Sequence, residues 1–298
     1  MFSFETAKLE DKTFLSLTSL TVSEFEKLLV PFSKSCSEIF NETTRDPRLG
    51  GRPPALAKME DRLFFILFYL KTYPLQEVIA YAFGMSQGTA NVLIHQLSHA
   101  LKITLNDMGY VPARITSDML KKLESEMPQA YVIDGTERPI VRPSNPEDQK
   151  LFYSGKKKRH TVKNNIINGE SDRQIKYLGK THEGKKHDKK IACEEETTLP
   201  ENSTLYRDLG FQGHEVPGVN IQQPKKKPKG GSLTDDEKKS NQLISSIRVV
   251  VEHVISGVKR LRIVKDVFRN TTADYDDLVV ELACSLHNFR SFYRLKDY

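Results

Sequence analysis

Apolar residues recur at helical spacing across residues 57–101, and they divide this stretch into three predicted helices. The second helix spans Leu75 to Ala82, after which Gly84 permits a sharp turn and Ser86 can cap the third helix. A helix, a glycine turn and a capped helix form a helix-turn-helix arrangement. The apolar faces of the first and third helices are Leu63, Phe64, Leu67, Phe68 and Leu70, and Ala90, Leu93, Ile94 and Leu97.

Polar residues near the exposed side of the third helix indicate contact with DNA. Amide side chains can bond adenine edges, and hydroxyl groups can bond bases or phosphates. We therefore predict a helix-turn-helix DNA-binding domain over residues 51–105. The alternative is a three-helix packing domain without DNA contacts. The predicted contact residues are Ser86, Gln87, Thr89 and Asn91.

The segments on either side carry weaker patterns. Residues 1–50 are predicted to be an N-terminal helical arm and linker. Residues 41–56 are rich in glycine, proline and arginine, which break regular structure and leave the arginines free to reach phosphates. Residues 106–129 are predicted to be a connector that includes a helix from Thr116 to Glu126.

From Tyr131 onward the pattern changes to that of strands. The second and third strands are joined by the turn sequence Asn168-Gly169, which predicts an antiparallel start to a mixed sheet. Residues 130–298 are therefore expected to form one α/β domain. The predicted strands cover residues 131–133, 158–167, 174–179 and 203–208.

Three helices complete the predicted α/β domain. One begins near His187 and Asp188, a long one runs from Thr234 to about Lys259, and the last spans Tyr275 to Phe292. The predicted apolar stripe of the long helix is Leu243, Ile247, Val250, Val254, Val258 and Leu261.

Acidic residues follow two of the predicted strands. Asp134 ends the first strand and is followed by Gly135, and Asp208 ends the fourth. On the long helix Glu252 shares one face with Arg248 and Lys259, which by itself is also typical of a solvated salt-bridge ladder.

These carboxylates together predict a metal site. Hard oxygen ligands suit Mg²⁺, and two such ions about 3.5–4 Å apart can activate a water or a 3′-hydroxyl and stabilise the leaving oxygen. Arg248 and Lys259 would then hold the DNA backbone beside the metals.

The distribution of charge favours the same partner. The formal net charge is +6, with 45 basic and 39 acidic residues, so the total alone favours a polyanion only weakly. The cations are clustered, and one cluster contributes the predicted DNA contacts Lys157, Lys158 and Arg159. The alternative is a set of solvated lysine loops. The clusters are residues 156–159, 185–186, 189–190 and 225–229.

Other features bound the location of the protein. Three separated cysteines without a CxxC pair fit a reducing compartment and no structural zinc. The first residues lack the pattern of a signal peptide, and the longest apolar run, Leu63 to Leu70, is far short of the ~20 residues that span a bilayer. We therefore expect a cytoplasmic, nucleoid-associated protein with no membrane partner.

Four segments carry a family resemblance: Val132–Ile140, Tyr153–Thr161, His187–Ile191 and Ser246–His253. They resemble bacterial insertion-sequence transposases of the DDE superfamily, in the branch that also resembles eukaryotic Harbinger-type transposases, and the resemblance covers roughly residues 50–290. It implies a ribonuclease H-like mixed sheet with flanking helices behind an all-α helix-turn-helix domain. It also implies cut-and-paste DNA cleavage and strand transfer with two Mg²⁺ or Mn²⁺ ions.

The resemblance also implies roles for single residues. In the wider group the catalytic helix carries tyrosine, arginine, glutamate and lysine at fixed spacing; Arg248, Glu252 and Lys259 match, whereas Ser245 stands at the tyrosine position. The second aspartate stays open. Asp208 is preferred because the second acid of this fold follows the fourth strand, and Asp188 is the alternative, as a fourth ligand or an orienting group.

The expected partners are double-stranded DNA, both as terminal inverted repeats and as target, and a second copy of the chain. Transposition joins two ends at once, so a homodimer or a larger synaptic complex is expected. The alternatives are a domesticated nuclease and a transcription regulator, which would bind DNA without transposition.

Overall fold

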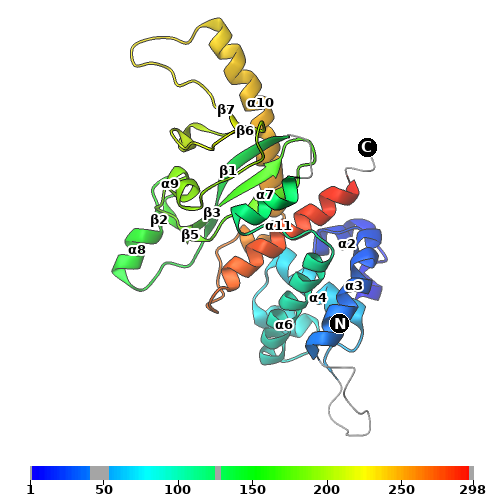
Figure 1. Ribbon diagram of the computed structural model, residues 1–298. Coiled ribbons are helices and arrows are strands. Elements are labelled where there is room, and N and C mark those ends of the chain that lie inside the picture. The colour runs from blue at the N-terminus through cyan, green and yellow to red at the C-terminus, as the bar shows by residue number, and fades with distance from the viewer. Residues whose placement is uncertain (1, 41–53, 125–128, 295–298) are drawn as a thin grey trace. The chain divides into compact units, whose positions relative to one another are not determined.

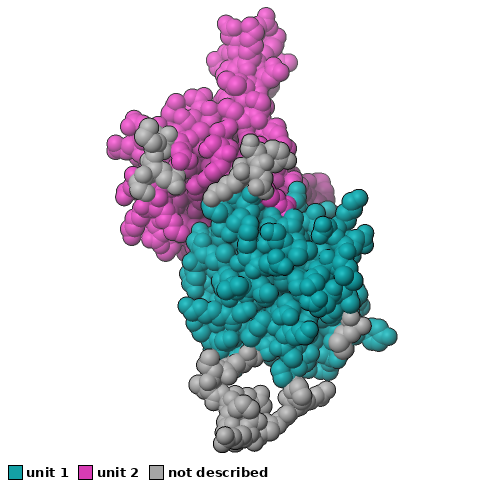
Figure 2. All heavy atoms as spheres, turned by 90° about the vertical axis from the view of Figure 1, so that its right-hand side faces the viewer, with its two compact units in different colours: residues 1–111, 259–266, 273–293 teal, residues 112–258, 267–272, 294–298 magenta. Residues whose placement is uncertain are grey.

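The computed structural model describes residues 2–40, 54–124 and 129–294, so most of the predicted linker over residues 41–56 lies outside the described residues. The chain forms two compact units, which Figure 2 shows in different colours. The helical unit is Met1–Val111, Lys259–Asp266 and Ala273–Tyr293, and the sheet unit is Pro112–Val258, Val267–Thr272 and Arg294–Tyr298.

Helices build the helical unit around a core of aromatic rings. Phe14, Phe25, Phe64 and Phe83 are fully buried and contact one another edge-on, tilted or stacked. Its helices are α1 (Phe4–Ala7), α2 (Asp11–Thr18), α3 (Val22–Phe40), α4 (Met59–Thr72), α5 (Gln76–Ala82), α6 (Gln87–Asp107), the 3₁₀ helix η3 (Arg262–Val264) and α11 (Tyr275–Arg294).

The turn between α5 and α6 follows the prediction. Gly84 has φ +69°, a conformation that costs glycine little. The Ser86 hydroxyl accepts a hydrogen bond from the Thr89 backbone N–H at 3.1 Å and caps α6. Ala90, Ile94 and Leu97 are buried, as the helical spacing requires. The predicted helix-turn-helix arrangement is confirmed.

Helix α11 packs within the helical unit. The Tyr275 and Ser98 hydroxyl oxygens lie 3.0 Å apart, and Lys102 forms an ion pair with the buried Glu281 at 2.7 Å. Asn288 Nδ2 donates to the Tyr110 carbonyl at 3.0 Å. These buried polar contacts lie within the helical unit, to which α11 belongs. The expected domain boundary instead assigned all of residues 130–298 to the α/β domain. The sequence pattern gives the buried face of α11 but not its partner.

A mixed sheet is the frame of the sheet unit. The strand order is β2-β3-β1-β6-β7, with β4 and β5 also paired to β3; β1 is antiparallel to β3 and parallel to β6. The mixed α/β class is confirmed (Figure 1). The strands are β1 (Ala130–Pro139), β2 (Tyr153–Ser154), β3 (Arg159–Gly169), β4 (Ile175–Leu178), β5 (His182–Glu183), β6 (Thr204–Tyr206) and β7 (Asn220–Gln222).

Helices and a buried core accompany the sheet. The core includes Tyr131, Ile133, Ile167, Leu205 and Phe211, all almost completely buried. The helical elements are α7 (Thr116–Leu123), α8 (Pro146–Phe152), α9 (Asp188–Glu194), the 3₁₀ helix η2 (Leu209–Phe211) and α10 (Asp235–Val258). Among the described residues, no helix has both the length and the apolar character needed to cross a membrane.

Strand β1 is longer than predicted. It continues through Asp134 and Gly135 to Pro139, because β3 pairs with it over that whole length, Asp134 opposite Ile166 and Gly135 opposite Asn165. The prediction that the strand ends at Asp134 and turns at Gly135 was therefore wrong. The glycine has another role, which the site explains.

Helix α10 buries a different stripe from the predicted one. Ile244 and Val251 are buried with Val254 and Val258, whereas Leu243 is 63% exposed. The first turns of α10 project beyond the sheet (Figure 1, yellow). The helix ends at Val258, and Lys259 is the first residue of the turn that follows.

Candidate active site

One aspartate lies on a strand, and a second lies just beyond the end of the neighbouring parallel strand. Val132 and Tyr206 form the last registered pair between β1 and β6. Asp134 and Asp208 each lie two residues beyond that pair. Because side chains alternate between the faces of a strand, residues two further along both strands share one face at the same edge. The fold thus brings together two acids that are far apart in the sequence.

Asp134 carries a perturbed carboxyl group. Burial raises the pKa of Asp134 to about 6, against the lowering effect of a hydrogen bond that its Oδ1 accepts from the Gly135 N–H at 2.8 Å. The carboxylates of Asp208 and Asp188 raise the pKa further, and the Arg248 guanidinium lowers it. Asp134, Asp188 and Asp208 therefore act on one another electrostatically.

Asp208 is fixed at the start of a short helix. Its Oδ1 accepts a hydrogen bond from the Gly210 N–H at 2.7 Å and caps η2, and its Oδ2 lies 3.9 Å from Nη2 of Arg248 on α10. One carboxylate oxygen is therefore held by the backbone. The other faces a cation contributed by the long helix.

Asp188 approaches β1 from the start of α9. Its Oδ1 accepts a hydrogen bond from Lys163 Nζ at 3.1 Å, and the same ammonium lies 3.6 Å from Glu137 Oε1. A Cβ at Gly135 would lie only 2.8 Å from Asp188 Cγ. Gly135 is thus required for close approach of this carboxylate to the strand, rather than for a turn.

Lys163 was missed by sequence reasoning. Its side chain is only 8% exposed, and it lies between two acids. The signal for it in the sequence is a lysine within a strand, followed by six residues that are all asparagine, isoleucine or glycine. A buried lysine in such a strand requires an acidic partner.

Glu252 is not brought to the aspartates in this structure. It is exposed, and it forms no hydrogen bond or ion pair with another described residue. It lies one helical turn after Arg248, which does reach Asp208. Within residues 2–40, 54–124 and 129–294, no three His, Cys, Asp or Glu side chains are placed to hold a metal ion.

The chemistry of the acidic cluster nevertheless fits divalent cations. The three aspartates supply hard oxygen donors, which Mg²⁺ and Mn²⁺ prefer. Burial is the main cause of the raised pKa of Asp134, and the charges of Asp208 and Asp188 add to it. A cation bound at this position would favour the ionised form of the buried carboxyl group.

The predicted DNA contacts lie on exposed elements of their units. Lys157, Lys158 and Arg159 are exposed around the turn between β2 and β3, which the buried Ser154 anchors: its hydroxyl accepts from Lys157 N–H at 3.2 Å and its carbonyl from Lys158 N–H at 2.8 Å. Arg248 is 20% exposed beside Asp208.

The start of α6 holds a polar cluster that sequence reasoning found only in part. Gln87 Nε2 and Asn91 Nδ2 both donate to Oε1 of Gln76, at 2.6 and 3.2 Å. Ser86 and Gln87 are exposed, and Thr89 and Asn91 are half-buried. Gln76 lies on α5, so no spacing within one helix indicates it.

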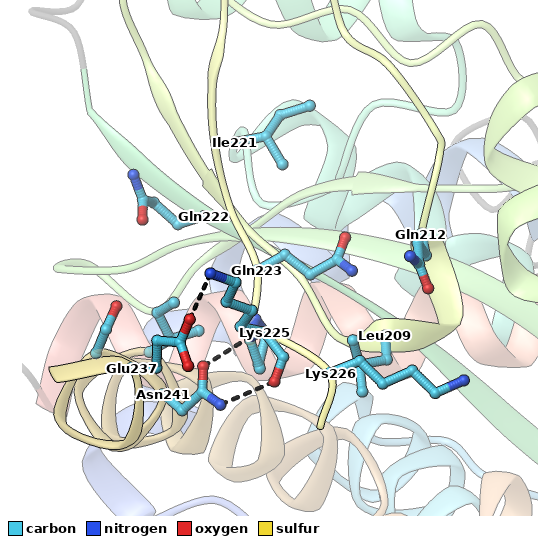
Figure 3. A pocket seen from close by; sticks show the side chains of 12 residues that line it. Leu209, Gln212, Ile221, Gln222, Gln223, Lys225, Lys226, Glu237 and Asn241 are labelled. Carbon is cyan, nitrogen blue, oxygen red and sulfur yellow. Dashed lines mark hydrogen bonds and ion pairs between the residues drawn. The ribbon is translucent and has the colours of Figure 1, made fainter. Parts of the chain in front are cut away.

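A polar cavity of about 420 Å³ follows Asp208 (Figure 3). Asn241 holds the loop that contains Lys225 at the wall of this cavity. The Lys225 N–H donates to Asn241 Oδ1 at 2.7 Å, and Asn241 Nδ2 donates to the Lys225 carbonyl at 3.0 Å. Lys225 also pairs with Glu237 at 2.5 Å. Gln212, Gln222, Gln223 and Lys226 contribute further polar groups to this wall.

Comparisons with known proteins agree with this architecture. Residues 133–288 match the family of DDE superfamily endonucleases, and residues 54–107 match the helix-turn-helix of DDE superfamily endonucleases. The chain belongs to the DDE superfamily of endonucleases. The resemblance found in the sequence is thereby confirmed at the level of the superfamily, while the Harbinger-type branch stays a prediction.

Two relatives carry names from insertion sequences. A protein of Microchaete diplosiphon named "Probable transposase for insertion sequence element IS702" is 30% identical over 223 residues, covering 74% of this chain and 76% of the relative. A protein of Streptomyces albus G, named as a transposase for insertion sequence element IS112, is 23% identical over 218 residues, covering 72% and 74%. No solved structure matches the chain significantly.

Proposed function

We propose that this protein is a DNA transposase that binds the ends of a mobile element and performs metal-dependent phosphodiester cleavage and strand transfer by a cut-and-paste route. The observation that carries the proposal is that Asp134 and Asp208, each two residues beyond the last registered pair of β1 and β6, lie close enough to act on one another beside the cation Arg248. Membership of the endonuclease superfamily and the names of both relatives support it.

In this proposal Asp134, Asp208 and Glu252 hold two Mg²⁺ or Mn²⁺ ions, and Asp188 acts as a further ligand or as an orienting group. When bound, the two cations would polarise the scissile phosphate and lower the pKa of the attacking hydroxyl or water. Glu252 needs to approach the aspartates for this, and its exposed side chain on α10 is free of ion pairs that would hold it back.

The basic residues have a separate role in the proposal. Arg248 and Lys259 hold the DNA backbone at the acidic cluster, and Lys157, Lys158 and Arg159 extend this surface along the β2–β3 turn. Ser86, Gln87, Thr89 and Asn91 at the start of α6 read the terminal inverted repeats. Each contact with a phosphate positions the DNA, while contacts with base edges select it.

In this proposal cleavage and joining both proceed by in-line attack of a hydroxyl group or water on a phosphorus. A water attacks the scissile phosphorus in line and breaks its bond to the 3′-oxygen, which leaves as a 3′-hydroxyl. That hydroxyl then attacks a phosphorus of the target DNA in the same way, and the 3′-oxygen of the target strand leaves as a hydroxyl. Neither step requires a covalent bond to the protein. Two ends are joined together, so the active form is a homodimer or a larger synaptic complex.

The test compares the protein with its Asp134→Asn variant on DNA that carries the element's own ends. With Mg²⁺ the unmodified protein should cleave at the ends and join them to target DNA. The variant should lose both reactions by on the order of 10³-fold or more while still binding the ends. Asp235→Asn, at an acid whose side chain is 87% exposed, is the matched control and should keep activity.

Retained cleavage by Asp134→Asn would overturn the proposed site. Cleavage by the unmodified protein without any joining would instead identify a nuclease, and binding without cleavage would identify a DNA-binding regulator. The three readings are thus separated by two products in one reaction.

A further inference from the structure

A second cavity of the sheet unit lies beside α8 and the first residues of β3. It has a volume of about 790 Å³ and contains no residue of the acidic cluster. We call it the Tyr153 pocket. Its lining consists of Arg142, Pro146, Gln149, Lys150, Tyr153, Gly155, His160 and Lys185.

The charge of the Tyr153 pocket has one sign. Arg142, Lys150 and Lys185 line it, and no acidic residue does. Arg142 Nη2 donates to Gln149 Oε1 at 2.7 Å, which fixes the guanidinium at the rim. Lys150 and Lys185 are exposed, and neither forms an ion pair with another described residue. Three cations without an acidic partner in the pocket favour an anion that reaches all of them.

An aromatic ring lies among these cations. Tyr153 is 42% exposed, and its ring meets that of His160 edge-on at 5.7 Å. The two residues are registered partners of β2 and β3, so the sheet fixes the position of the ring. An exposed ring beside cations is the combination that binds single-stranded nucleic acid, because a base stacks on the ring while phosphates pair with the cations.

The ring selects between paired and unpaired DNA. In a duplex the base faces are covered by their neighbours, so only an unpaired base can stack on Tyr153. The backbone of either form satisfies lysine and arginine. The exposed tyrosine is therefore used only if the DNA in the pocket is single-stranded.

We propose that the Tyr153 pocket binds one or two unpaired nucleotides of the DNA substrate, with a base stacked on Tyr153 and phosphates on Arg142, Lys150 and Lys185. This inference rests on the proposed function, because it assigns the pocket to the same DNA. His160 is six residues from Ile166, the partner of Asp134, which is a distance of about 20 Å at ~3.3 Å per residue. The pocket would thus hold nucleotides that lie roughly 20 Å from the acidic cluster.

The first experiment measures binding of a fluorescent oligothymidylate by anisotropy, with unlabelled duplex in excess to occupy the helix-turn-helix region. Tyr153→Ala should weaken binding about fivefold or more, and Tyr153→Phe, which keeps the stacking face, should not. Lys150→Ala should weaken binding and also reduce the slope of log affinity against log salt by about 0.7, whereas Tyr153→Ala should leave the slope unchanged.

Two variants are controls for position. Lys121→Ala removes a cation from α7 whose side chain is 75% exposed and which does not line the pocket. Tyr81→Ala removes a tyrosine that is 91% exposed on α5. Both should bind the oligothymidylate as the unmodified protein does, so that a loss in Tyr153→Ala reports the pocket rather than the loss of any cation or ring.

The second experiment locates the base directly. An oligonucleotide containing 5-iododeoxyuridine is irradiated with the protein, and the crosslinked peptide is identified by mass spectrometry. A crosslink at Tyr153 supports the proposal. Equal affinity of Tyr153→Ala and the unmodified protein, preference of the pocket for duplex, or crosslinks confined to other residues would overturn it. The cleavage reaction is measured on separate DNA, so loss of the pocket proposal leaves the proposed transposase function standing.

Discussion

The polar groups at the start of α6 and those of the acidic cluster differ in the partners that they find. At α6 the donors of Gln87 and Asn91 share the acceptor Gln76, and Ser86 caps the helix. At the sheet edge burial raises the pKa of Asp134 to about 6, and the carboxylates of Asp208 and Asp188 raise it further. The polar groups of the first set bond one another, whereas the carboxylates of the second repel one another and are held by other parts of the chain.

This difference separates recognition from chemistry. A reading surface keeps its shape before DNA arrives if its side chains already bond one another, which lowers the entropy lost on binding. Carboxylates that are held close together against repulsion gain when a cation binds, because the cation removes the repulsion. Substitutions at α6 should therefore reduce stability and affinity modestly, and substitutions of Asp134 or Asp208 should abolish activity with little loss of stability.

The largest expected effect separates Asp208 from Asp188. Asp208→Asn should reduce cleavage by on the order of 10³-fold, because Asp208 follows the strand beside β1 and its charge acts on Asp134. Asp188→Asn should reduce it by about 10–100-fold, because Lys163 already neutralises that carboxylate. Cleavage rates of both variants at saturating Mg²⁺ decide the matter, and the reverse order of effects would identify Asp188 as the second catalytic acid.

The next effect concerns Lys163, the buried cation that pairs with Asp188. Lys163→Met should lower the free energy of unfolding by about 3 kcal/mol, because it leaves Glu137 and Asp188 without their shared partner. Chemical denaturation measures this loss. Lys121→Met, at an exposed ion pair, is the control and should cost less than about 1 kcal/mol. If both variants were equally stable, the ammonium would not be holding the two acids together.

The sequence predicted local features better than convergent ones. Ser86, Gly84 and the buried positions of α6 follow from spacing and turn chemistry within a few residues, and all of them stand in the structure. The Asp134–Asp208 pair required a strand count, which placed Asp208 after β6. Whether Asp208 is the second catalytic acid stays a prediction.

What the sequence could not supply depends on contacts between distant segments. The length of β1 depends on β3, and the role of Gly135 depends on Asp188, which lies 53 positions later. The stripe of α10 was displaced because Leu243 is as apolar as Ile244, and only the packing surface selects between them. Gln76 and Lys163 are polar residues whose partners lie on other elements. The spacing of residues within one helix or strand therefore predicts neither set of contacts.

A third prediction uses pH to test how acids outside the cluster behave. Burial raises the pKa of Glu195 to about 7, against opposing hydrogen bonds from the Lys180 N–H and the Tyr177 side chain. The folded protein then holds a proton that the unfolded chain releases above its usual value of 4.5, so this group contributes stability at low pH that is lost as pH rises from 4.5 to about 7. Stability of Glu195→Gln relative to the unmodified protein should increase over that range.

The size of the Glu195 effect is bounded by the shift. The difference between the variant and the unmodified protein should grow by up to about 3 kcal/mol between the two pH values. Denaturation midpoints measured across the range give it directly, and the difference cancels the contribution of Asp134. A constant difference would show that burial does not raise the pKa of Glu195 in the folded protein.

The smallest expected effect is that of substitutions at Gln76, which test the polar cluster at the start of α6. Gln76→Ala removes the acceptor shared by Gln87 and Asn91 and should lower the free energy of unfolding by about 1 kcal/mol. Gln76→Glu keeps an acceptor at that position and should keep the stability. The same carboxylate adds a negative charge to the surface that meets DNA in the proposed function, so affinity for the element's ends should fall in Gln76→Glu and its dependence on salt should change. A Gln76→Glu protein that binds DNA as well as the unmodified one would show that the cluster stabilises α6 without facing the DNA, since a new charge near phosphates cannot be neutral to binding.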